Sequence, residues 1–308
     1  MAEETRWGVI YATNPGLFKA HKRWKQIKKY IDQKGIKYDF VQSEAVGSVE
    51  RLAGMMCDNS YHTIVIVGDD GALYDAINAI MTHRESLPSD FAFGVVPVGV
   101  GHDFARFWGI TQDNWQDAVD HIIARKTRKI DVAHITYEND QGEQTRYFLN
   151  CINIGLGARL VKITNDLIRI TGTGFFSVVS TMLRHIFELK SYNLKFKIET
   201  EIVDGQYMSV CIGNGLGYGQ TPNAVFYNGM IDVSTVTRPL WWQVFEGFWL
   251  LGKGCFLNYK NVHPYRAESV KVLDVGKALV TLDGRELAEK NPTPFVVGVE
   301  KEVVNFIM

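Results

Sequence analysis

The first 125 residues alternate apolar runs with amphipathic helical patterns, and this alternation limits the fold more than any other feature. Apolar runs at 7–12, 63–67 and 92–96 predict strands, and so does the segment 38–42. Strand–helix alternation of this kind builds a mostly parallel, doubly wound sheet, whose ligands bind outside the carboxyl ends of the strands. We therefore expect an α/β domain with a site at those ends. The predicted helices cover 18–31, 48–57, 72–83, 103–108 and 114–125.

Two of the predicted strand-to-helix turns contain glycines and an aspartate. Residues 67–72 are Val-Gly-Asp-Asp-Gly-Ala, and residues 96–104 are Val-Pro-Val-Gly-Val-Gly-His-Asp-Phe. Backbone N–H groups in glycine turns and at helix N-termini bind anions. Asp70 and Asp103 are poor partners for a bare phosphate but suitable ones for a magnesium-bound phosphate. The alternative is an ordinary turn in which Asp70 caps the following helix.

The chain changes character after the basic stretch 125–129. Mostly strand-like runs follow, with a hairpin signal at Asn139–Gly142 and a helical pattern at 175–189. We therefore expect a boundary near 128 and a β-rich second domain. The predicted strands are 130–137, 145–154, 193–200, 206–213, 230–237, 268–273, 278–282 and 294–299.

Composition excludes several classes of protein. The 33 basic and 34 acidic side chains nearly cancel, which argues against a dedicated nucleic-acid binder. Four cysteines without paired spacing indicate neither a disulfide framework nor a zinc site, and favour a cytoplasmic protein. The apolar stretch 241–251 is interrupted by Gln243 and Glu246, and is too short to span a bilayer.

Several segments resemble motifs of the diacylglycerol, sphingosine and YegS-like bacterial lipid kinases. Gly68–Ala72 resembles their GGDGT motif, and residues 97–106 resemble P-L-G-T-x-N-D-F-A-R. The similarity continues, in family order, at Phe148–Asn150 with Gly155, Asn214–Pro222, Asn228–Val233 and Asp283–Gly284. It extends from about residue 7 to 305. NAD kinases share the motif of the first turn, but the motifs that residues 97–106 and Asp283–Gly284 resemble belong to the lipid kinases.

The resemblance implies the NAD kinase/diacylglycerol kinase-like fold. In that fold, residues 1–128 form a doubly wound α/β nucleotide-binding domain, and residues 129–308 form a β-sandwich-like lipid-substrate domain. The implied activity is the ATP- and Mg²⁺-dependent phosphorylation of a hydroxyl of a diacylglycerol-like lipid. The implied partner is the lipid, with peripheral contact at the inner membrane face and no nucleic acid. The resemblance also leaves a homodimer open.

The resemblance also implies roles for individual residues. Asp283 is the implied general base, which takes the proton of the lipid hydroxyl. Asp70 is implied as the magnesium ligand, and a second, structural magnesium would lie at Asn228 and Met230. Asp131 matches an acid at the start of the family's second domain. The implied nucleotide-binding residues are Asn14, Ser43, Gly68, Asp69, Asp70, Gly71, Ala72, Gly99, Val100 and Asp103.

The chain departs from the family pattern at several of these positions. Asp69 replaces a glycine and Ala72 replaces a threonine, while Val100 and His102 replace a threonine and an asparagine. Each lost hydrogen bond to a charged phosphate would be worth about 1.5–3 kcal/mol. His102 could donate to a phosphate or obstruct the pocket. A non-catalytic nucleotide- or lipid-binding protein on the same scaffold is therefore the alternative function.

The aromatic stretch 240–251 has two interpretations. Tryptophans favour the bilayer interface, and the basic residues Arg238, Lys253, Lys260 and Arg266 lie near the stretch in sequence. It is therefore either a lipid-facing helix or a helix that packs its aromatic side chains onto the β-rich domain.

Overall fold

The computed structural model of the chain divides into two compact units. Unit 1 contains the chain up to Ile130 together with Glu302–Met308, and unit 2 is Asp131–Lys301. The chain passes between the units within two strands, β5 (Thr127–Asn139) and β15 (Phe295–Ile307). The structure describes residues 6–12, 18–45, 47–99, 101–171, 181, 183–287 and 293–308.

Unit 1 is built on a parallel sheet in the order β4-β3-β1-β2. The strands are β1 (Trp7–Tyr11), β2 (Tyr38–Gln42), β3 (Thr63–Gly68) and β4 (Ala92–Pro97). The three inner strands β1, β3 and β4 are buried along their whole length. This agrees with their continuous apolar sequences, since a parallel sheet is covered on both faces.

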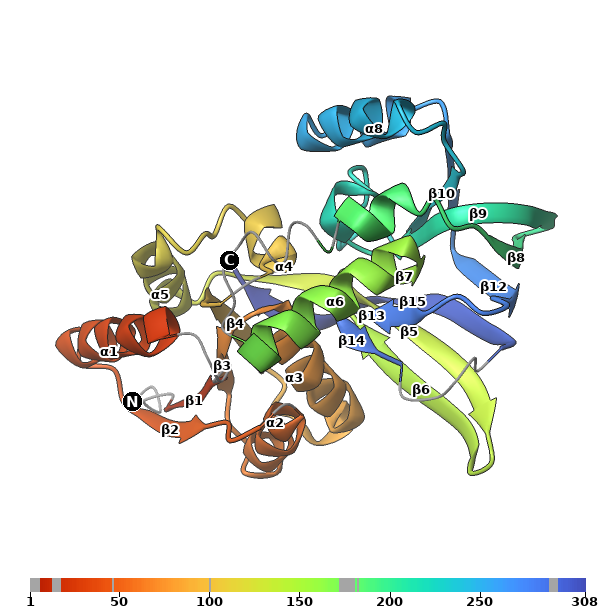
Figure 1. Cartoon of the computed structure of the whole chain (residues 1–308). Helices are drawn as coiled ribbons and strands as arrows, with labels where there is room; N and C mark the ends of the chain where they lie inside the picture. The colour runs from red at the N-terminus through yellow and green to blue at the C-terminus, as the bar shows by residue number, and fades with distance from the viewer. Residues whose placement is uncertain are drawn as a thin grey trace. The chain divides into compact units, whose positions relative to one another are not determined.

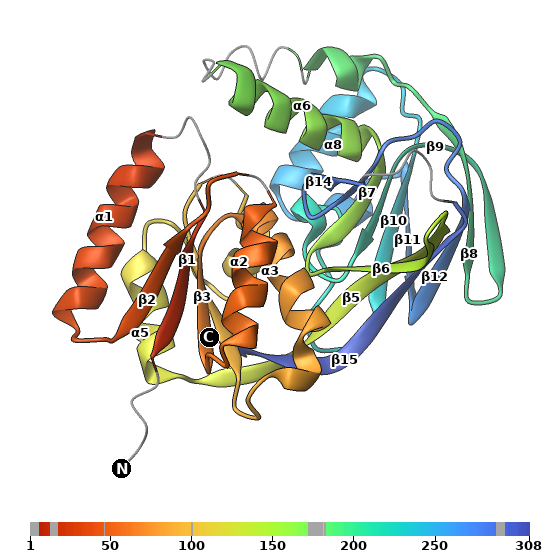
Figure 2. The ribbon, with the colours of Figure 1, turned by 90° about the horizontal axis from the view of Figure 1, so that it is seen from below.

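Helices cover both faces of this sheet (Figure 2). Helices α1 (Phe18–Gln33) and α5 (Trp115–Ala124) lie on one face, where the rings of Tyr30 and Trp115 meet edge to face at 5.6 Å. Helices α2 (Ser48–Asp58) and α3 (Asp70–Thr82) lie on the other. The short elements η1 (Arg84–Ser86) and α4 (Asp103–Phe107) complete the unit. The doubly wound arrangement is thus confirmed.

Unit 2 is β-rich and largely antiparallel (Figure 1). Strand β9 pairs with β7, β8 and β10, and β12 joins β8 to β15. Besides parts of β5 and β15, its strands are β6 (Gly142–Phe148), β7 (Cys151–Gly155), β8 (Tyr192–Ile198), β9 (Glu201–Gly213), β10 (Ile231–Thr237), β11 (Val262–Ala267), β12 (Ser269–Asp274), β13 (Val280–Leu282) and β14 (Arg285–Glu286). Its other elements are α6 (Leu156–Thr171), α8 (Gln243–Gly252), η2 (Gly217–Gly219) and η3 (Phe256–Asn258).

The structure corrects several expected elements. The strand expected at 145–154 is two strands, β6 and β7, because the backbone N–H groups of residues 149–151 donate to the Asp283 carboxylate instead of continuing a ladder. Helix α6 and strand β11 were not expected. Strand β11 contains Pro264 and pairs only with β10, and proline in a sheet is confined to such edge positions. Of the helix expected at 175–189, residues 181 and 183–187 are helical, and residues 175–180 and 182 lie outside the described residues.

The expected division at 128/129 also differs from the structure at the far end of the chain. Residues 302–308 belong to unit 1, because Phe306 pairs with Phe93 of β4 and is fully buried there.

Within the described ranges, none of the helices is both long enough and apolar enough to cross a bilayer.

Candidate functional site

The first glycine turn of unit 1 joins β3 to α3. Gly68 ends the buried strand, and a Cβ at this position would lie only 2.9 Å from the Cβ of Ala72 and 3.0 Å from that of Ala12. Packing is therefore by itself a sufficient reason for glycine at position 68. Asp69 is the N-cap of α3, and its Oδ1 accepts the Ala72 N–H at 3.0 Å. A side-chain carboxylate thus uses one of the N–H groups that a bound anion would otherwise meet.

Asp70 connects this turn to the second one. Its carboxylate is buried and accepts the N–H groups of Asp103, at 2.7 Å, and Phe104, at 3.4 Å. Its own N–H donates to the Gly101 carbonyl at 3.0 Å. Asp70 therefore stabilises the first turn of α4, as well as lying at the start of α3. The two roles expected for Asp70, stabilising a turn and binding magnesium-bound phosphate, are compatible, since one carboxylate can orient a turn and also face a ligand.

The second turn lies beside the first because both follow neighbouring parallel strands. The Val98 N–H donates to the Gly68 carbonyl at 3.0 Å, and Gly99 and Gly101 have φ values of 112° and 87°. Only glycine adopts such values without strain. Asp103 begins α4, is buried, and lies 3.5 Å from the Arg106 guanidinium. The structure therefore brings together five of the predicted nucleotide-binding positions, namely Gly68, Asp69, Asp70, Gly99 and Asp103.

The other predicted nucleotide residues are placed as follows. Gly71 and Ala72 lie in the first turn of α3, and Ala72 is buried. Ser43 is buried just after β2, and its N–H donates to the Tyr11 carbonyl at 2.9 Å. Asn14 and Val100 lie outside the described residues.

His102 is enclosed beside the second turn. Its Nε2 contacts the side-chain amide of Gln112, whose Nε2 also donates to the Gly99 carbonyl at 2.5 Å. Burial lowers the pKa of the imidazole below its usual 6.5, although the nearby Asp69 and Asp103 carboxylates oppose the shift. A neutral ring can donate one hydrogen bond but adds no positive charge for a phosphate. Gln112 could not be assigned a role from sequence, because this residue lies outside every motif.

The Asp283 carboxylate of unit 2 accepts hydrogen bonds from three consecutive backbone N–H groups. Asp283 is buried and has φ 43°, and with Gly284 at φ 84° it forms the tight turn of the β13–β14 hairpin. Its oxygens accept the N–H groups of Leu149 at 2.7 Å, Asn150 at 3.0 and 3.1 Å, and Cys151 at 2.8 Å. These donors stabilise the anion, which is the form that accepts a proton, and they fix its orientation.

Two asparagines next to Asp283 were not assigned a role from sequence. The Asn150 carbonyl accepts the Asn214 N–H at 2.9 Å, and the Asn214 Nδ2 donates to the Leu149 carbonyl at 3.0 Å. The Oδ1 atoms of both asparagines are buried without a hydrogen-bond partner in the described part of the chain. Both asparagines lie in segments that resemble the lipid kinases, Phe148–Asn150 and Asn214–Pro222, and this resemblance is the sequence signal that could have identified them.

The predicted magnesium ligands do not assemble a carboxylate cluster. The Asn228 Oδ1 accepts the Met230 N–H at 3.0 Å, and the Asp131 Oδ2 accepts the Gly229 N–H at 2.6 Å. These oxygens therefore stabilise the turn before β10. Across the residues that the structure describes, no three or more His, Cys, Asp or Glu side chains lie close enough to hold a metal ion.

Comparisons with protein-family models match nearly the whole chain. Residues 6–135 match the diacylglycerol kinase catalytic domain, and residues 150–307 match the YegS C-terminal NAD kinase beta sandwich-like domain. The second match alone covers half of the chain. The β-rich unit is therefore of the β-sandwich-like type that the sequence led us to expect.

Individual relatives agree with the family models. The chain is 24% identical to the diacylglycerol kinase of Bacillus subtilis (strain 168), over 90% of this chain and 88% of that protein. It is 27% identical to a "Probable lipid kinase YegS-like" of Alcanivorax borkumensis, over 61% of this chain and 59% of that protein. A solved diacylglycerol kinase structure from Bacillus anthracis str. Sterne has a TM-score of 0.69 at 16% identity, and the match covers 100% of this chain and 98% of that one. The structural likeness shows a shared fold.

Proposed function

Because the chain belongs to the family of the diacylglycerol kinase catalytic domain, with the YegS-type C-terminal domain, we propose that it phosphorylates a hydroxyl of a diacylglycerol-like lipid with ATP. The observation that supports this most is the buried Asp283 carboxylate, which three consecutive backbone N–H groups hold in one orientation. It occupies the position at which the resemblance implies the general base.

In the proposed reaction, the lipid hydroxyl oxygen attacks the γ-phosphorus of ATP while its proton passes to the Asp283 carboxylate. The bond from that phosphorus to the bridging oxygen of ADP breaks, and ADP leaves with the electron pair. The products are the phosphorylated lipid, ADP and a proton. The protein contributes mainly position and charge compensation, as phosphoryl transfer requires.

The two glycine turns are the proposed phosphate contacts. Gly68, Gly99 and Gly101 leave the backbone without side chains where the turns meet, and α3 adds its N-terminal dipole. Asp70 is the proposed magnesium ligand, and when bound the ion would neutralise phosphate charge.

The substrate implies where the protein acts. A diacylglycerol-like lipid resides in a bilayer, and ATP is cytoplasmic, so we propose peripheral contact with the inner face of the membrane. A homodimer is compatible with this proposal.

The Asp69 carboxylate on the Ala72 N–H favours a second candidate function, a nucleotide or lipid binder without turnover, because this carboxylate competes with phosphate for the α3 N-terminus.

The test is ATP turnover by the purified full chain with diacylglycerol in mixed micelles and Mg²⁺. We expect an organic-soluble phosphorylated product, and we expect Asp283→Asn to lower its rate at least about 100-fold. Asp140→Asn, which changes an exposed carboxyl in the β5–β6 turn, is the matched control and should retain full activity.

Three outcomes separate the candidates. Turnover that is lost only in Asp283→Asn supports the kinase and its base. Absence of turnover with every lipid tested, together with measurable ATP binding, supports the binder. Absence of any thermal shift with millimolar nucleotide overturns both nucleotide-dependent readings.

A further inference from the structure

Helix α8 of unit 2 is apolar on both sides, but the described residues bury only one of them. Val244 is buried, and a Cβ on Gly247 would lie 3.1 Å from the Tyr259 ring. The Tyr259 hydroxyl donates to the Gln243 carbonyl at 3.0 Å, and Leu250 and Leu251 pack against the core around Phe256 and Tyr259. This inner side fixes the helix, so the outer side is not needed to hold it in place.

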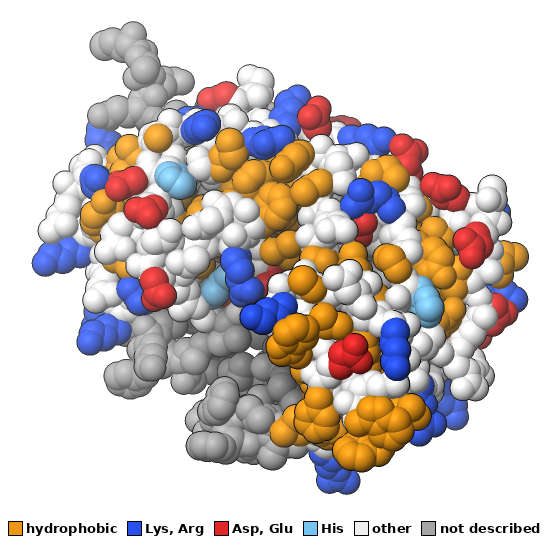
Figure 3. Space-filling model, turned by 90° about the horizontal axis from the view of Figure 1, so that it is seen from above, with side chains coloured by type: hydrophobic (Ala, Val, Ile, Leu, Met, Phe, Trp, Pro, Cys, Tyr) orange, Lys and Arg blue, Asp and Glu red, His pale blue; other side chains and the backbone are white. Residues whose placement is uncertain are grey.

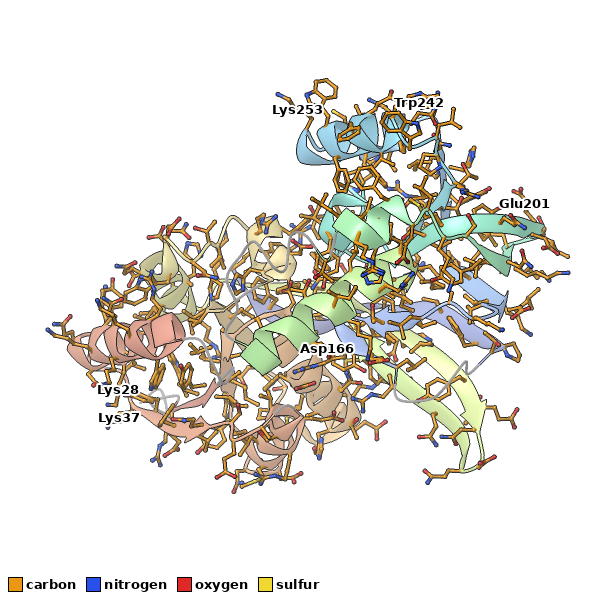
Figure 4. The ribbon with its side chains drawn as sticks, viewed as in Figure 1. Lys28, Lys37, Asp166, Glu201, Trp242 and Lys253 are labelled. Carbon is orange, nitrogen blue, oxygen red and sulfur yellow. The ribbon has the colours of Figure 1, made fainter. Side chains whose placement is uncertain are left out.

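The outer side is a continuous aromatic surface. We call it the aromatic face, and its residues are Leu240, Trp241, Trp242, Phe245, Phe248 and Trp249. Their exposed fractions run from 45% for Phe248 to 63% for Trp249. Figure 3 shows hydrophobic side chains gathered on this part of the surface, and Figure 4 shows Trp242 and Lys253 at opposite ends of α8. Packing onto the β-rich unit, one of the two interpretations of this stretch, therefore accounts only for the inner side.

The face is large and extends beyond α8. The spacing of Trp242, Phe245 and Trp249 places these side chains along one stripe of the helix. Phe187 lies with its ring centroid 5.8 Å from that of Phe245, and both Phe187 and Leu183 are exposed. Exposed apolar patches of this kind mark interaction sites on proteins.

The composition of the face indicates a bilayer. Of the chain's seven tryptophans, the three exposed ones, Trp241, Trp242 and Trp249, all lie on it. Tryptophan has an apolar ring system and a polar N–H, and it concentrates where hydrocarbon meets lipid headgroups. A protein core would bury these N–H groups and require a partner for each.

The charges around the face indicate anionic headgroups. Arg238, Lys253 and Lys260 are exposed near it, and none of the three forms an ion pair within the described ranges. Glu246 is the one acidic residue of α8. Basic side chains beside an apolar helix face attract anionic lipid. A second copy of the chain would instead bring the same basic groups against one another.

We propose that the aromatic face and its flanking basic residues form a docking surface for an anionic bilayer, with the helix axis along the membrane plane. The inference rests on the proposed function only in that a lipid substrate lies in such a bilayer. Beyond the proposed function, the inference identifies the surface that contacts the membrane, the orientation of α8 on the membrane and the headgroup charge that the surface recognises.

The experiment is co-sedimentation of the full chain with sucrose-loaded vesicles of phosphatidylcholine, with and without phosphatidylglycerol. We expect binding to the anionic vesicles and a loss of at least about tenfold in partition for Trp241→Ser/Trp249→Ser, because two interfacial anchors are removed. Ile202→Ser is the matched control, since Ile202 is 60% exposed in unit 2 but lies on β9. Lys253→Glu/Lys260→Glu should reduce binding to the level seen with phosphatidylcholine alone, and Lys271→Glu should not.

Quenching of tryptophan fluorescence by brominated lipid gives a second readout that does not depend on sedimentation. Unchanged melting temperatures of the surface variants would show that folding is intact. The proposal is overturned if the tryptophan variant binds as tightly as the original chain, if neither vesicle binds, or if the variant only converts a dimer to a monomer. Asp283→Asn should bind vesicles normally, so failure of the kinase proposal and failure of this one give different results.

Discussion

At the scale of single residues, the candidate site is a set of carboxylates that already have backbone partners. Asp69 accepts an N–H of α3, Asp70 accepts two N–H groups of α4, and Asp283 accepts three from residues 149–151. Each therefore stabilises a turn or a helix start of the backbone. Substitutions at these positions are expected to change stability as well as any ligand binding, so the two effects must be measured separately.

The pair Asp69 and Ala72 gives a test of nucleotide affinity. Asp69→Gly with Ala72→Thr removes the carboxylate from the Ala72 N–H and restores a hydroxyl, so we expect the Kd for ATP to fall by roughly tenfold. Loss of the helix cap should cost only a few tenths of a kcal/mol. Isothermal titration calorimetry measures the affinity, with Asp113→Gly as a control at an exposed acid of the same unit. An unchanged Kd would show that Asp69 does not obstruct phosphate.

His102 makes stability depend on pH. Its pKa is lowered by burial, so the unfolded chain takes up a proton near pH 6.5 while the folded chain still holds a neutral ring. The contribution of the neutral His102 ring to the free energy of unfolding is therefore complete above pH 6.5. It is lost as the pH falls toward the lowered pKa that His102 has in the folded chain. We expect the melting temperature to drop less in His102→Asn than in the original chain between about pH 8 and about pH 5.5.

The control for this prediction is His263→Asn, which changes an exposed histidine on β11. That variant should follow the original chain across the pH range. Burial also lowers the pKa of His134, so a residual dependence should persist in His102→Asn. Parallel melting curves for all three proteins would contradict the assignment to His102.

At the scale of elements, Asp283 ties the β13–β14 hairpin to the break between β6 and β7. Asp283→Asn keeps a residue type that tolerates φ 43°, but turns an NH₂ group toward backbone N–H donors. We expect unfolding in urea to show a loss of about 1–3 kcal/mol. Asp274→Asn is a control at the exposed last residue of β12 and should lose less. Equal stability of both variants would mean that the N–H groups find other partners.

The elements also show what sequence could predict and what it could not. The four parallel strands of unit 1 were predicted because each is a local apolar run followed by a helical pattern. The break at Leu149 and Asn150 was not, because its cause is Asp283, more than 130 residues away. The same holds for the site: the glycine turns and Asp283 stand out in sequence, whereas the unpartnered Asn150 and Asn214 oxygens depend on long-range packing.

At the scale of the whole molecule, unit 1 is completed by residues that follow unit 2 in the chain. The centroid of the Phe306 ring lies 5.3 Å from that of Phe93, 4.8 Å from that of Phe104 and 5.2 Å from that of Trp108, in tilted or edge-to-face arrangements. Phe104 belongs to α4, whose first N–H groups donate to the Asp70 carboxylate. The end of β15 therefore supports one of the two candidate phosphate turns.

Truncation of this ring should act on unit 1 as a whole. We expect Phe306→Ala to lower the free energy of unfolding by about 3–5 kcal/mol, because it leaves a cavity among three aromatic rings. Hydrogen exchange followed by mass spectrometry should show faster exchange in β4 and α4. Val296→Ala, at a 38% exposed position of the same strand, should leave exchange unchanged. Protection of β4 and α4 in Phe306→Ala would contradict this role of β15.

The two crossings between the units impose an order on synthesis. A ribosome makes the four parallel strands first, then all of residues 131–301, and only afterwards the segment 302–308 that lies against β4. Until that segment emerges, the β4 edge has no neighbouring strand and the pocket for Phe306 is empty, which is the kind of exposed surface that chaperones bind. The four parallel strands of unit 1 are therefore made before unit 2, but their sheet is completed only after unit 2 has been made.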